Sequence, residues 1–434
     1  MSGLELLFPI LAFATLLGVP LYAWRVRGRA YATFGFILLA IALPGALVVH
    51  ARLRVLLGAQ LAPWLDLAFA YCMAAAAVHL VALVRPRLRT APFRYGVSIP
   101  GMTFIAAGAL SGLWLLVLLP VRVVLWLLGL ESVLHVLAWF DLWPIVVAAA
   151  SVFTSTRLVD EVVRVTIADE GPDEVTRLPV QRYRGRPPRP LERRPLRIVQ
   201  IADPHLGPWQ PVKKLRRQID ALIDRDPDLV LLTGDFLTME GVGTPGALAE
   251  ALEPLQRAPG RCFAVFGNHD HESPEEVARA LAANGVRLLL DAEAVVETPV
   301  GPVQIIGADY RGKGRRQHLQ DVLARHPRRN GHLRLLLLHD PSAFKHVPKG
   351  DVDLTLSGHT HGGQLGLVSF GLDWTVLRRT PFPDHGLFGH GPNRLYVHRG
   401  TGFYGFPLRI GVPGEASCLE VVVAEEHLRV QAAG

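Results

Sequence analysis

The stretch Leu-Val-Leu-Leu-Thr-Gly-Asp at residues 229–235 decides the fold, because an apolar run ends there in a glycine and a carboxylate. Glycine permits a tight turn, and the carboxylate is left at the end of a predicted strand. Other polar motifs recur along the chain, most of them after similar runs: Asp203-Pro204-His205, Gly267-Asn268-His269-Asp270, His339 and Gly358-His359-Thr360-His361. The carboxyl ends of neighbouring strands meet in one crevice in α/β folds, so we expect these side chains to converge.

Residues 196–434 alternate between predicted strands and helices. Strands are predicted at 196–202, 229–233, 262–266, 303–307, 333–338 and 353–357, with closing strands at 394–398 and 417–423. Helices are predicted at 210–225, 245–257 and 274–284. This alternation predicts an α/β domain. The segment 366–392, rich in Gly, Pro and aromatic residues, is predicted to be a long functional loop.

Residues 1–155 have a different composition, and apolar runs fill them. Half of the 434 residues are hydrophobic, and this excess lies in the first part of the chain. Candidate membrane helices, each near the ~20 residues needed to cross the hydrocarbon core, are predicted at 4–24, 31–49, 61–84, 101–120 and 133–153. Asp141 and Pro144 interrupt the fifth, so four and five crossings both remain open. The other ionisable groups there, Asp66, His79 and His135, are interpreted as interfacial or as helix packing.

Loop charges predict the orientation of these helices. Arginines gather in the first and third loops, whereas the second has only Arg52 and Arg54. The positive-inside rule places the arginine-rich loops in the cytoplasm, and an odd number of crossings then places residues beyond 156 there too. The membrane loops therefore account for much of the net charge of +7, and binding to nucleic acid is not needed to explain it. The sequence also lacks the basic residues interleaved with aromatics that are typical of nucleic-acid channels. Three cysteines show no metal or disulfide spacing.

Residues 156–195 are predicted to link the two parts, with a candidate edge strand at 162–167. Residues 177–197 contain eight arginines and several prolines. Two interpretations stay open: a solvated linker, or a basic stripe on anionic lipid headgroups.

The polar motifs share one chemistry, because each supplies hard oxygen or imidazole ligands. Taken alone, each has an ordinary explanation: Asp235 as a helix cap, or His339 as a buried, satisfied histidine. Taken in order, they predict a site for two metal ions. Two metals held together typically serve the hydrolysis of a phosphate ester or anhydride, because they activate water and polarise phosphoryl oxygens.

The order D-x-H, GD, GNHD, isolated His and GH-x-H resembles the calcineurin-like metallophosphoesterase superfamily, over about residues 196–423. The resemblance implies an α-helical membrane region followed by an αββα sandwich. It implies Asp235 as a ligand bridging two divalent ions, Mn, Fe or Zn. One ion would take Asp203, His205 and His361, and the other Asn268, His339 and His359. It also implies that His269 acts on the substrate, with Asp270 holding its imidazole.

The tail Arg399-Gly-Thr-Gly-Phe-Tyr-Gly405 with Pro407-Leu-Arg409 is similar to a bacterial membrane-associated branch that includes UDP-diacylglucosamine pyrophosphohydrolase-like enzymes. Two positions depart from the family pattern. Pro204 stands where the family usually has a larger apolar residue, and Phe236-Leu-Thr238 lacks a second acid found in many relatives. Neither is a ligand position.

The resulting hypothesis is a membrane-anchored phosphohydrolase for a phosphodiester or pyrophosphate of a lipid-linked substrate, with His269 as general acid. Membrane lipids are its expected partners, and its oligomeric state is open. An apolar entrance is predicted from Leu367, Phe370, Trp374, Phe382 and Phe388, and Arg399 or Arg409 is a candidate for binding a second phosphate. The alternatives are a nuclease or nucleotide phosphodiesterase, or a membrane sensor or transporter with a regulatory phosphoesterase domain.

Overall fold

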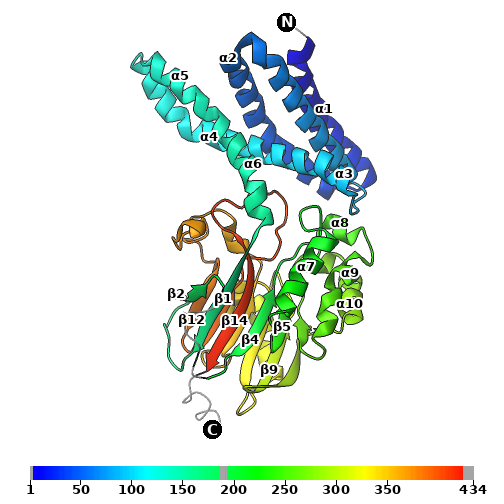
Figure 1. Ribbon diagram of the computed structural model, residues 1–434, viewed down its shortest axis with the longest axis vertical. Coiled ribbons are helices and arrows are strands. Elements are labelled where there is room, and N and C mark those ends of the chain that lie inside the picture. The colour runs from blue at the N-terminus through cyan, green and yellow to red at the C-terminus, as the bar shows by residue number, and fades with distance from the viewer. Residues whose placement is uncertain (1–2, 186–190, 192, 424–434) are drawn as a thin grey trace. The chain divides into compact units, whose positions relative to one another are not determined.

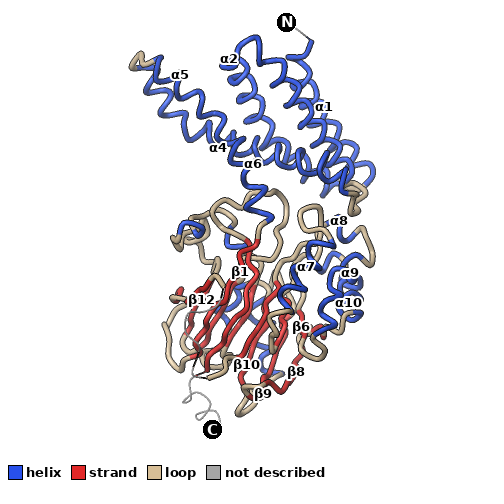
Figure 2. The backbone as a smooth tube through the Cα atoms, in the orientation of Figure 1, coloured by secondary structure: helices blue, strands red, loops and turns tan. Residues whose placement is uncertain are grey.

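The computed structural model describes residues 3–185, 191 and 193–423, which form two compact units. The first unit comprises Met1–Phe153 with Gly405–Leu408, and the second comprises Thr154–Tyr404 with Arg409–Gly434. The first is helical, and the strands lie in the second (Figure 2). Long apolar helices followed by a mixed α/β domain confirm the predicted fold class.

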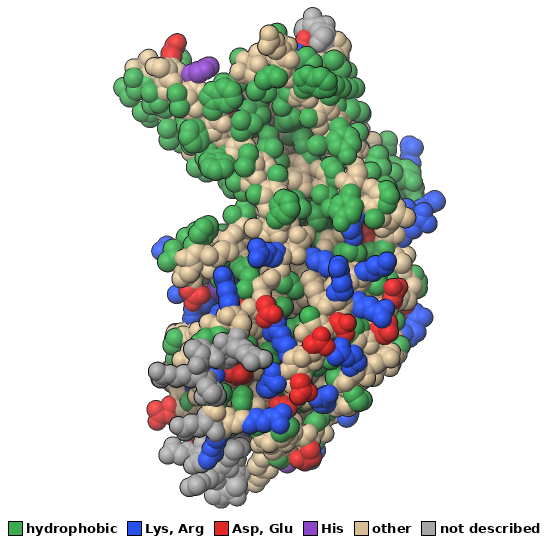
Figure 3. All heavy atoms as spheres, in the orientation of Figure 1, with side chains coloured by type: hydrophobic (Ala, Val, Ile, Leu, Met, Phe, Trp, Pro, Cys, Tyr) green, Lys and Arg blue, Asp and Glu red, His purple; other side chains and the backbone are tan. Residues whose placement is uncertain are grey.

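Most of the helices in the amino-terminal part of the chain are long and apolar. They are α1 (Gly3–Val26), α2 (Arg29–Ala82), α3 (Ala91–Phe93), a π turn (Arg94–Ser98), α4 (Ile99–Leu127), α5 (Glu131–Trp139), a 3-10 turn (Phe140–Leu142) and α6 (Trp143–Thr156). Within the described residues, four helical stretches are long and apolar enough to cross a membrane: Gly3–Val26, Arg29–Ala82, Ala91–Leu127 and Glu131–Thr156. Hydrophobic side chains cover most of the visible surface of this unit (Figure 3).

Helix α2 is two antiparallel segments rather than one rod. Gly58, in its interior, has a φ of 69°, which breaks the helix. His50 Nε2 lies 2.8 Å from Asp66 Oδ1, although a straight helix would separate these residues by about 24 Å at 1.5 Å per residue. The chain therefore reverses at Gly58. The number of actual membrane crossings stays a prediction.

Small residues bring α2 and α4 close together. A Cβ on Gly101 would come within 2.6 Å of the Ala76 amide, and one on Gly108 within 2.5 Å of the Ala42 carbonyl. Such backbone approach gives van der Waals contact where lipid supplies no hydrophobic driving force. His79 lies 3.1 Å from Ser98 Oγ, as the helix-packing interpretation expects.

Two seven-stranded sheets form the second unit, in the orders β3-β1-β14-β4-β5-β6-β7 and β2-β12-β13-β11-β10-β9-β8. The strands of the first sheet are β1 (Leu158–Ile167), β3 (Gln181–Tyr183), β4 (Leu196–Ile201), β5 (Leu229–Leu232), β6 (Cys262–Ala264), β7 (Arg287–Leu288) and β14 (Gly414–Val423). Those of the second are β2 (Thr176–Leu178), β8 (Ala292–Thr298), β9 (Gly301–Ala308), β10 (Leu333–Leu338), β11 (Leu354–Ser357), β12 (Gly386–His390) and β13 (Asn393–Val397). The central strands β4-β5-β6 and β9-β10-β11-β13 are parallel, so their carboxyl ends share one edge.

Helices cover the outer faces of the sheets, and Figure 1 shows α7, α9 and α10 gathered on one side. The helices are α7 (Val212–Ile223), α8 (Met239–Val242), α9 (Ala247–Leu252), α10 (Pro274–Ala283) and α11 (Arg315–Arg325). The 3-10 turns are Glu253–Arg257, Asp270–Glu272, Pro341–His346, His361–Gly363 and Val368–Phe370.

Alternation along the strands explains the layers. In β10, Leu335 and Leu337 face the core between the sheets, together with Ile198 and Leu231. Leu336 joins a separate cluster with residues of α11. Successive side chains point to opposite faces, so a strand apolar throughout is buried on both. The continuous leucines of β10 therefore require a four-layer αββα arrangement.

The predicted linker differs in the structure, because much of it is built into the sheets. β1 is not an edge strand: it pairs in parallel with β14 and antiparallel with β3. β2 and β3, in the arginine-rich stretch, extend one sheet each. Their arginines are neutralised, since Arg182 pairs with Glu161 at 2.9 Å and Arg177 pairs with Asp384. Arg186 and Arg189 of the predicted basic stripe lie outside the described residues.

Candidate metal centre

The predicted ligands converge at the carboxyl ends of the parallel strands. Two groups form there, each with its ligand atoms within 4.8 Å of one another. The first group is Asp203, His205 and His361, and the second is Asp235, His339 and His359. Each group contains one carboxylate and two imidazoles, a donor set that can hold a divalent ion.

Asp235 lies between the two groups. Its Oδ2 is 3.7 Å from His205 Nε2 in the first group and 3.3 Å from His339 Nε2 in its own. Asn268 completes the second group, because its Oδ1 is 3.2 Å from His339 Nε2. The structure therefore brings together all the residues predicted as ligands, and their assignment to individual ions stays a prediction.

The backbone is unusual at these positions. Asp203, His205, Asp235, His359 and His361 have φ between 44° and 71°, a region that residues with a Cβ rarely adopt. Such conformations persist where the surrounding fold fixes them, and they cluster at functional sites. Gly358 shows the crowding, because a Cβ added there would overlap the Asp203 carboxylate.

The donor set also fits a cation electrostatically. Burial alone would lower the pKa of His339, but the nearby Asp235 carboxylate raises it to about 10. Burial lowers the pKa of His205 to about 3, so that imidazole keeps its lone pairs. Within the described residues, the buried Nδ1 of His205 has no hydrogen-bond partner. The carboxylates of the site thus attract positive charge, and His205 presents an uncharged nitrogen donor.

Contacts between imidazoles support the same conclusion. His205 Nε2 lies 3.2 Å from His361 Nε2, and His359 Nδ1 lies 3.2 Å from His339 Nε2. Two lone pairs repel at this distance unless a proton or a metal ion is shared. The residues therefore fit the divalent ions that the motifs predict.

The structure separates the predicted catalytic pair, His269 and Asp270. The carboxylate of Asp270 accepts hydrogen bonds from the backbone amides of Asp235, Phe236 and Gly267 at 2.7–2.8 Å. Asp270 therefore holds in place the turns that carry the predicted ligands Asp235 and Asn268. The prediction that Asp270 holds the His269 imidazole is wrong, because its oxygens are turned to the backbone.

Glu272 contacts His269 instead, and sequence reasoning missed it. Its Oε1 lies 3.0 Å from His269 Nδ1, in the turn Asp270–Glu272. This carboxylate helps to raise the pKa of His269, although burial of the ring opposes the shift. An acid three residues after a histidine in a helical turn was a readable signal, because such residues are neighbours on the helix surface.

Two tyrosines border the centre, and sequence reasoning gave neither a role. The Tyr404 ring stacks on His269 with centroids 4.4 Å apart and an interplanar angle of 24°. The Tyr310 ring lies 6.2 Å from that of His339 and 6.3 Å from that of His359. Tyr310 and Tyr404 both lie in segments that follow strand ends. A tyrosine at such a position does not by itself indicate a functional role.

Arg399 and Arg409, of which one or the other was a candidate for binding a second phosphate, are both fully buried. Arg399 Nη2 donates to Glu161 at 2.7 Å. Arg409 Nη2 donates to the carbonyls of Arg399 and Gly402 at 2.7 and 2.6 Å. Both arginines therefore serve the scaffold beneath the ligands, and the predicted phosphate role is wrong.

Comparisons with known proteins agree with this geometry. The model of the calcineurin-like phosphoesterase family matches residues 196–363. The chain is 30% identical to the phosphodiesterase YaeI of Escherichia coli over 234 residues, 52% of this chain and 83% of that protein. It is 31% identical to the metallophosphoesterase YkoQ of Bacillus subtilis over 231 residues, 50% of this chain and 81% of that protein.

A relative with a membrane region is also similar. The chain is 32% identical to a Danio rerio transmembrane protein with a metallophosphoesterase domain, over 249 residues, 52% of this chain and 54% of that protein. The family match at residues 196–363 lies on the unit that carries the two ligand groups. The chain belongs to the calcineurin-like metallophosphoesterases and is a metal-dependent phosphoesterase.

Proposed function

We propose that this protein is a membrane-anchored phosphohydrolase that cleaves a phosphodiester or pyrophosphate bond in a lipid-linked substrate. The observation that carries the chemistry is the placement of His269 beside two adjoining cation-binding groups. His269 lies on the rim, with a quarter of its side chain exposed. Asp203 and Asp235 lie beneath it, fully buried.

The residues divide the work of hydrolysis among them. Bound divalent ions supply an activated water and polarise the phosphoryl oxygens. Asp235, between the two groups, holds both parts of the centre in register. His269 protonates the leaving oxygen. Burial opposes protonation of its imidazole, but the carboxylates of Glu272 and Asp235 raise its pKa above the ordinary value. We propose Mn, Fe or Zn as the ions, since nitrogen-rich sets with a bridging carboxylate suit them.

The lipid-linked substrate is supported by exposed apolar side chains on the unit that carries the site. Leu367, Phe370, Trp374 and Phe382 are between 38% and 75% exposed. Large exposed apolar groups on one segment mark a membrane or ligand surface. Phe388, predicted to join them, lies in β12 and is buried, with the Arg177 guanidinium over its ring. Phe388 therefore packs against the sheet and is not part of the proposed entrance.

The same chain carries helices able to cross a membrane, and the similar tail of UDP-diacylglucosamine pyrophosphohydrolase-like enzymes points to an acylated pyrophosphate. We propose a cytoplasmic location for the second unit, from the arginine-rich first and third loops. A reporter fused after Val423 should then behave as cytoplasmic. Digestion of this unit by protease added outside intact cells would overturn that location.

A substrate panel tests the function. Purified full-length protein in detergent or nanodiscs is given an acylated nucleoside pyrophosphate, an acylated phosphodiester, cyclic nucleotides, single-stranded nucleic acid and bis-p-nitrophenyl phosphate. We expect kcat/KM to be highest for one of the acylated substrates. If nucleotides or nucleic acid are turned over best, the protein is a nucleotide phosphodiesterase or nuclease. If the acylated substrates are inert, the lipid-linked proposal fails.

A further inference from the structure

The segment Gly366–Phe382, named here the apolar loop, differs from the rest of the second unit. Phe370 is 75% exposed, Leu372 56%, and Trp374 and Val376 46% each. The core between the sheets is built from buried apolar side chains, whereas these side chains are exposed. Isolated exposed apolar residues are ordinary, but a cluster of this kind on one loop marks an interaction surface.

The composition of the apolar loop favours a lipid surface over a protein partner. Trp374 is of a type enriched where a membrane meets water, and Phe370 is of a type that interfacial segments bury at the headgroup boundary. Arg378 and Arg379 follow them and are exposed. The loop has one acid, Asp373, and its carboxylate lies 3.1 Å from His385 Nε2 and 3.5 Å from Arg177 Nη1. The Asp373 side chain is 62% exposed and also lies 3.9 Å from Arg378. Because the two arginines outnumber this acid, the net charge of the loop is positive, which suits anionic headgroups.

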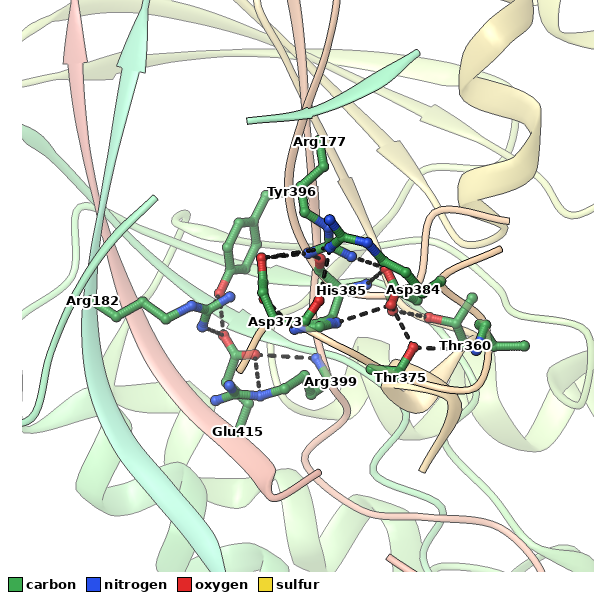
Figure 4. Close-up of polar contacts among 12 residues, drawn as sticks. Arg177, Arg182, Thr360, Asp373, Thr375, Asp384, His385, Tyr396, Arg399 and Glu415 are labelled. Carbon is green, nitrogen blue, oxygen red and sulfur yellow. Dashed lines mark hydrogen bonds and ion pairs between the residues drawn. The ribbon is translucent and has the colours of Figure 1, made fainter. Parts of the chain in front are cut away.

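A buried polar network holds the apolar loop in place (Figure 4). Asp384, just after the loop, is at its centre. The carboxylate of Asp384 accepts from Thr375 Oγ1 at 2.5 Å and from the His385 amide at 3.0 Å, and it pairs with Arg177. The exposed residues are thus carried on a base fixed to the sheet, rather than on a free tether.

The same residue fixes the ligand loop. Thr360, which lies between the predicted ligands His359 and His361, donates its hydroxyl to the Asp384 carbonyl at 2.5 Å. The apolar loop and the metal-binding loop therefore share one anchor. A surface that engages the apolar loop also fixes the direction in which the centre faces.

We propose that the apolar loop docks into the headgroup region of an anionic membrane and presents the metal centre to substrates at that surface. The occupant follows from three observations: aromatic side chains exposed beside arginines, a net positive charge on the loop, and a chain whose own helices are suited to a bilayer. The consequence for substrate choice rests on the proposed function, whereas the docking itself does not.

Site-directed spin labels on the full-length protein in nanodiscs containing phosphatidylglycerol test the docking. A nitroxide is placed at Phe370→Cys in a Cys72→Ala background, since the other two cysteines are buried. The control label is at Val295→Cys, an apolar residue of β8 that is 40% exposed. We expect the label at position 370 to collide with oxygen severalfold more than with a water-soluble nickel complex, and the control label to show the reverse.

Two outcomes would overturn the docking. One is a label at position 370 that is as accessible to nickel as the control. The other is a label shielded from both reagents with strong dipolar coupling between two copies, which would make the loop a contact between copies. Repeating the measurement in zwitterionic nanodiscs isolates the arginines, and a smaller oxygen preference is expected there.

Hydrolysis in the same nanodiscs separates this inference from the function. Phe370→Ser with Trp374→Ser should raise KM for an acylated substrate severalfold more than KM for bis-p-nitrophenyl phosphate, with Val295→Ser as control. If the label at position 370 lies in lipid but the acylated substrate is not hydrolysed, the proposed substrate is contradicted and the docking is supported. If the label is exposed to water and the acylated substrate is still hydrolysed, the docking is contradicted and the proposed substrate is supported.

Discussion

Carboxylates are completely buried both in the helical unit and in the candidate metal centre, but the two places neutralise them differently. In the helical unit, Asp141 is held by Arg52 and Arg122, each at 2.5 Å. In the second unit, the basic side chains recorded within 4 Å of Asp203 and Asp235 among the described residues are histidines only. An arginine never gives up its charge, whereas an imidazole can exchange a proton for a metal ion.

The difference teaches how to interpret a buried acid. Asp141, which interrupts the predicted fifth span, is fully buried and already paired with two arginines, so it has no unpaired charge to offer a metal ion. Asp66 is similar, with Arg54 at 3.1 Å and His50 at 2.8 Å. Asp235 instead lacks a permanent cation, and this lack is what makes its surroundings a metal site. Variants of the arginine-paired acids and of the acids in the candidate metal centre should therefore behave differently.

Removing the bridging charge should have the largest effect. Asp235→Asn should lose metal and reduce phosphodiester hydrolysis to background, because one carboxylate serves both ligand groups. Metal content by mass spectrometry and turnover of bis-p-nitrophenyl phosphate measure this, and excess chelator should reproduce the loss in the unmodified protein. Asp141→Asn, an equally buried control, should keep its metal. Two ions and full turnover in Asp235→Asn would contradict the comparison.

His269→Ala should retain both ions and still lose about 10²–10⁴-fold in turnover, the usual contribution of a general acid. The loss should be greatest for alkyl leaving groups and much smaller for p-nitrophenolate, which needs little protonation. Turnover of a matched pair of such esters, together with metal content, decides the role. A variant that loses its metal would place His269 among the ligands instead.

The sequence predicted the centre well because its signals are local. A carboxylate or imidazole directly after an apolar run locates a strand end, and parallel strand ends must share an edge. Asp203, Asp235, His339 and His359 all follow this rule. The central strands were predictable for the same reason, since an uninterrupted apolar run such as Leu333–Leu338 indicates burial on both faces.

The failures concern contacts between segments far apart in the chain. β1 pairs with β14 from Leu158–Gly414 to Ile167–Val423, whereas the sequence predicted only a linker with an edge strand at 162–167. Asp270 was assigned to the neighbouring imidazole, yet it satisfies amides that only the folded turns bring together. The predicted phosphate role of Arg409 failed likewise, because the sequence carries no record of how deeply a loop arginine is buried.

Asp141→Asn tests the structural side of the comparison. Breaking a buried ion pair by removing one partner costs about 3–5 kcal/mol, so the helical unit should unfold at a clearly lower temperature in detergent. Replacing the whole cluster, with Asp141→Leu, Arg52→Met and Arg122→Met, should recover most of the loss, because no unpaired charge remains. Unchanged thermal unfolding of the single variant would show that lipid or water satisfies the arginines.

The smallest effect is expected at Glu272, a third kind of carboxylate that is half exposed. Glu272→Gln keeps an acceptor for His269 Nδ1 but removes the charge that favours the protonated ring. Solvent screens that charge, so we expect about a tenfold loss in kcat, or about 1.4 kcal/mol, for alkyl esters and little change in KM. Glu275→Gln, on the exposed start of α10, is the matched control.

Asp270→Asn completes the test, because the two acids next to His269 should fail in different ways. Its oxygens hold amides of Asp235, Phe236 and Gly267, so the variant should lose metal affinity and thermal stability together. Glu272→Gln should change neither of these and should affect only esters that need a proton. If Asp270→Asn instead keeps its metal and shows the leaving-group dependence of His269→Ala, the orienting role returns to Asp270. In that case the buried carboxylate of Asp270 would serve His269 directly.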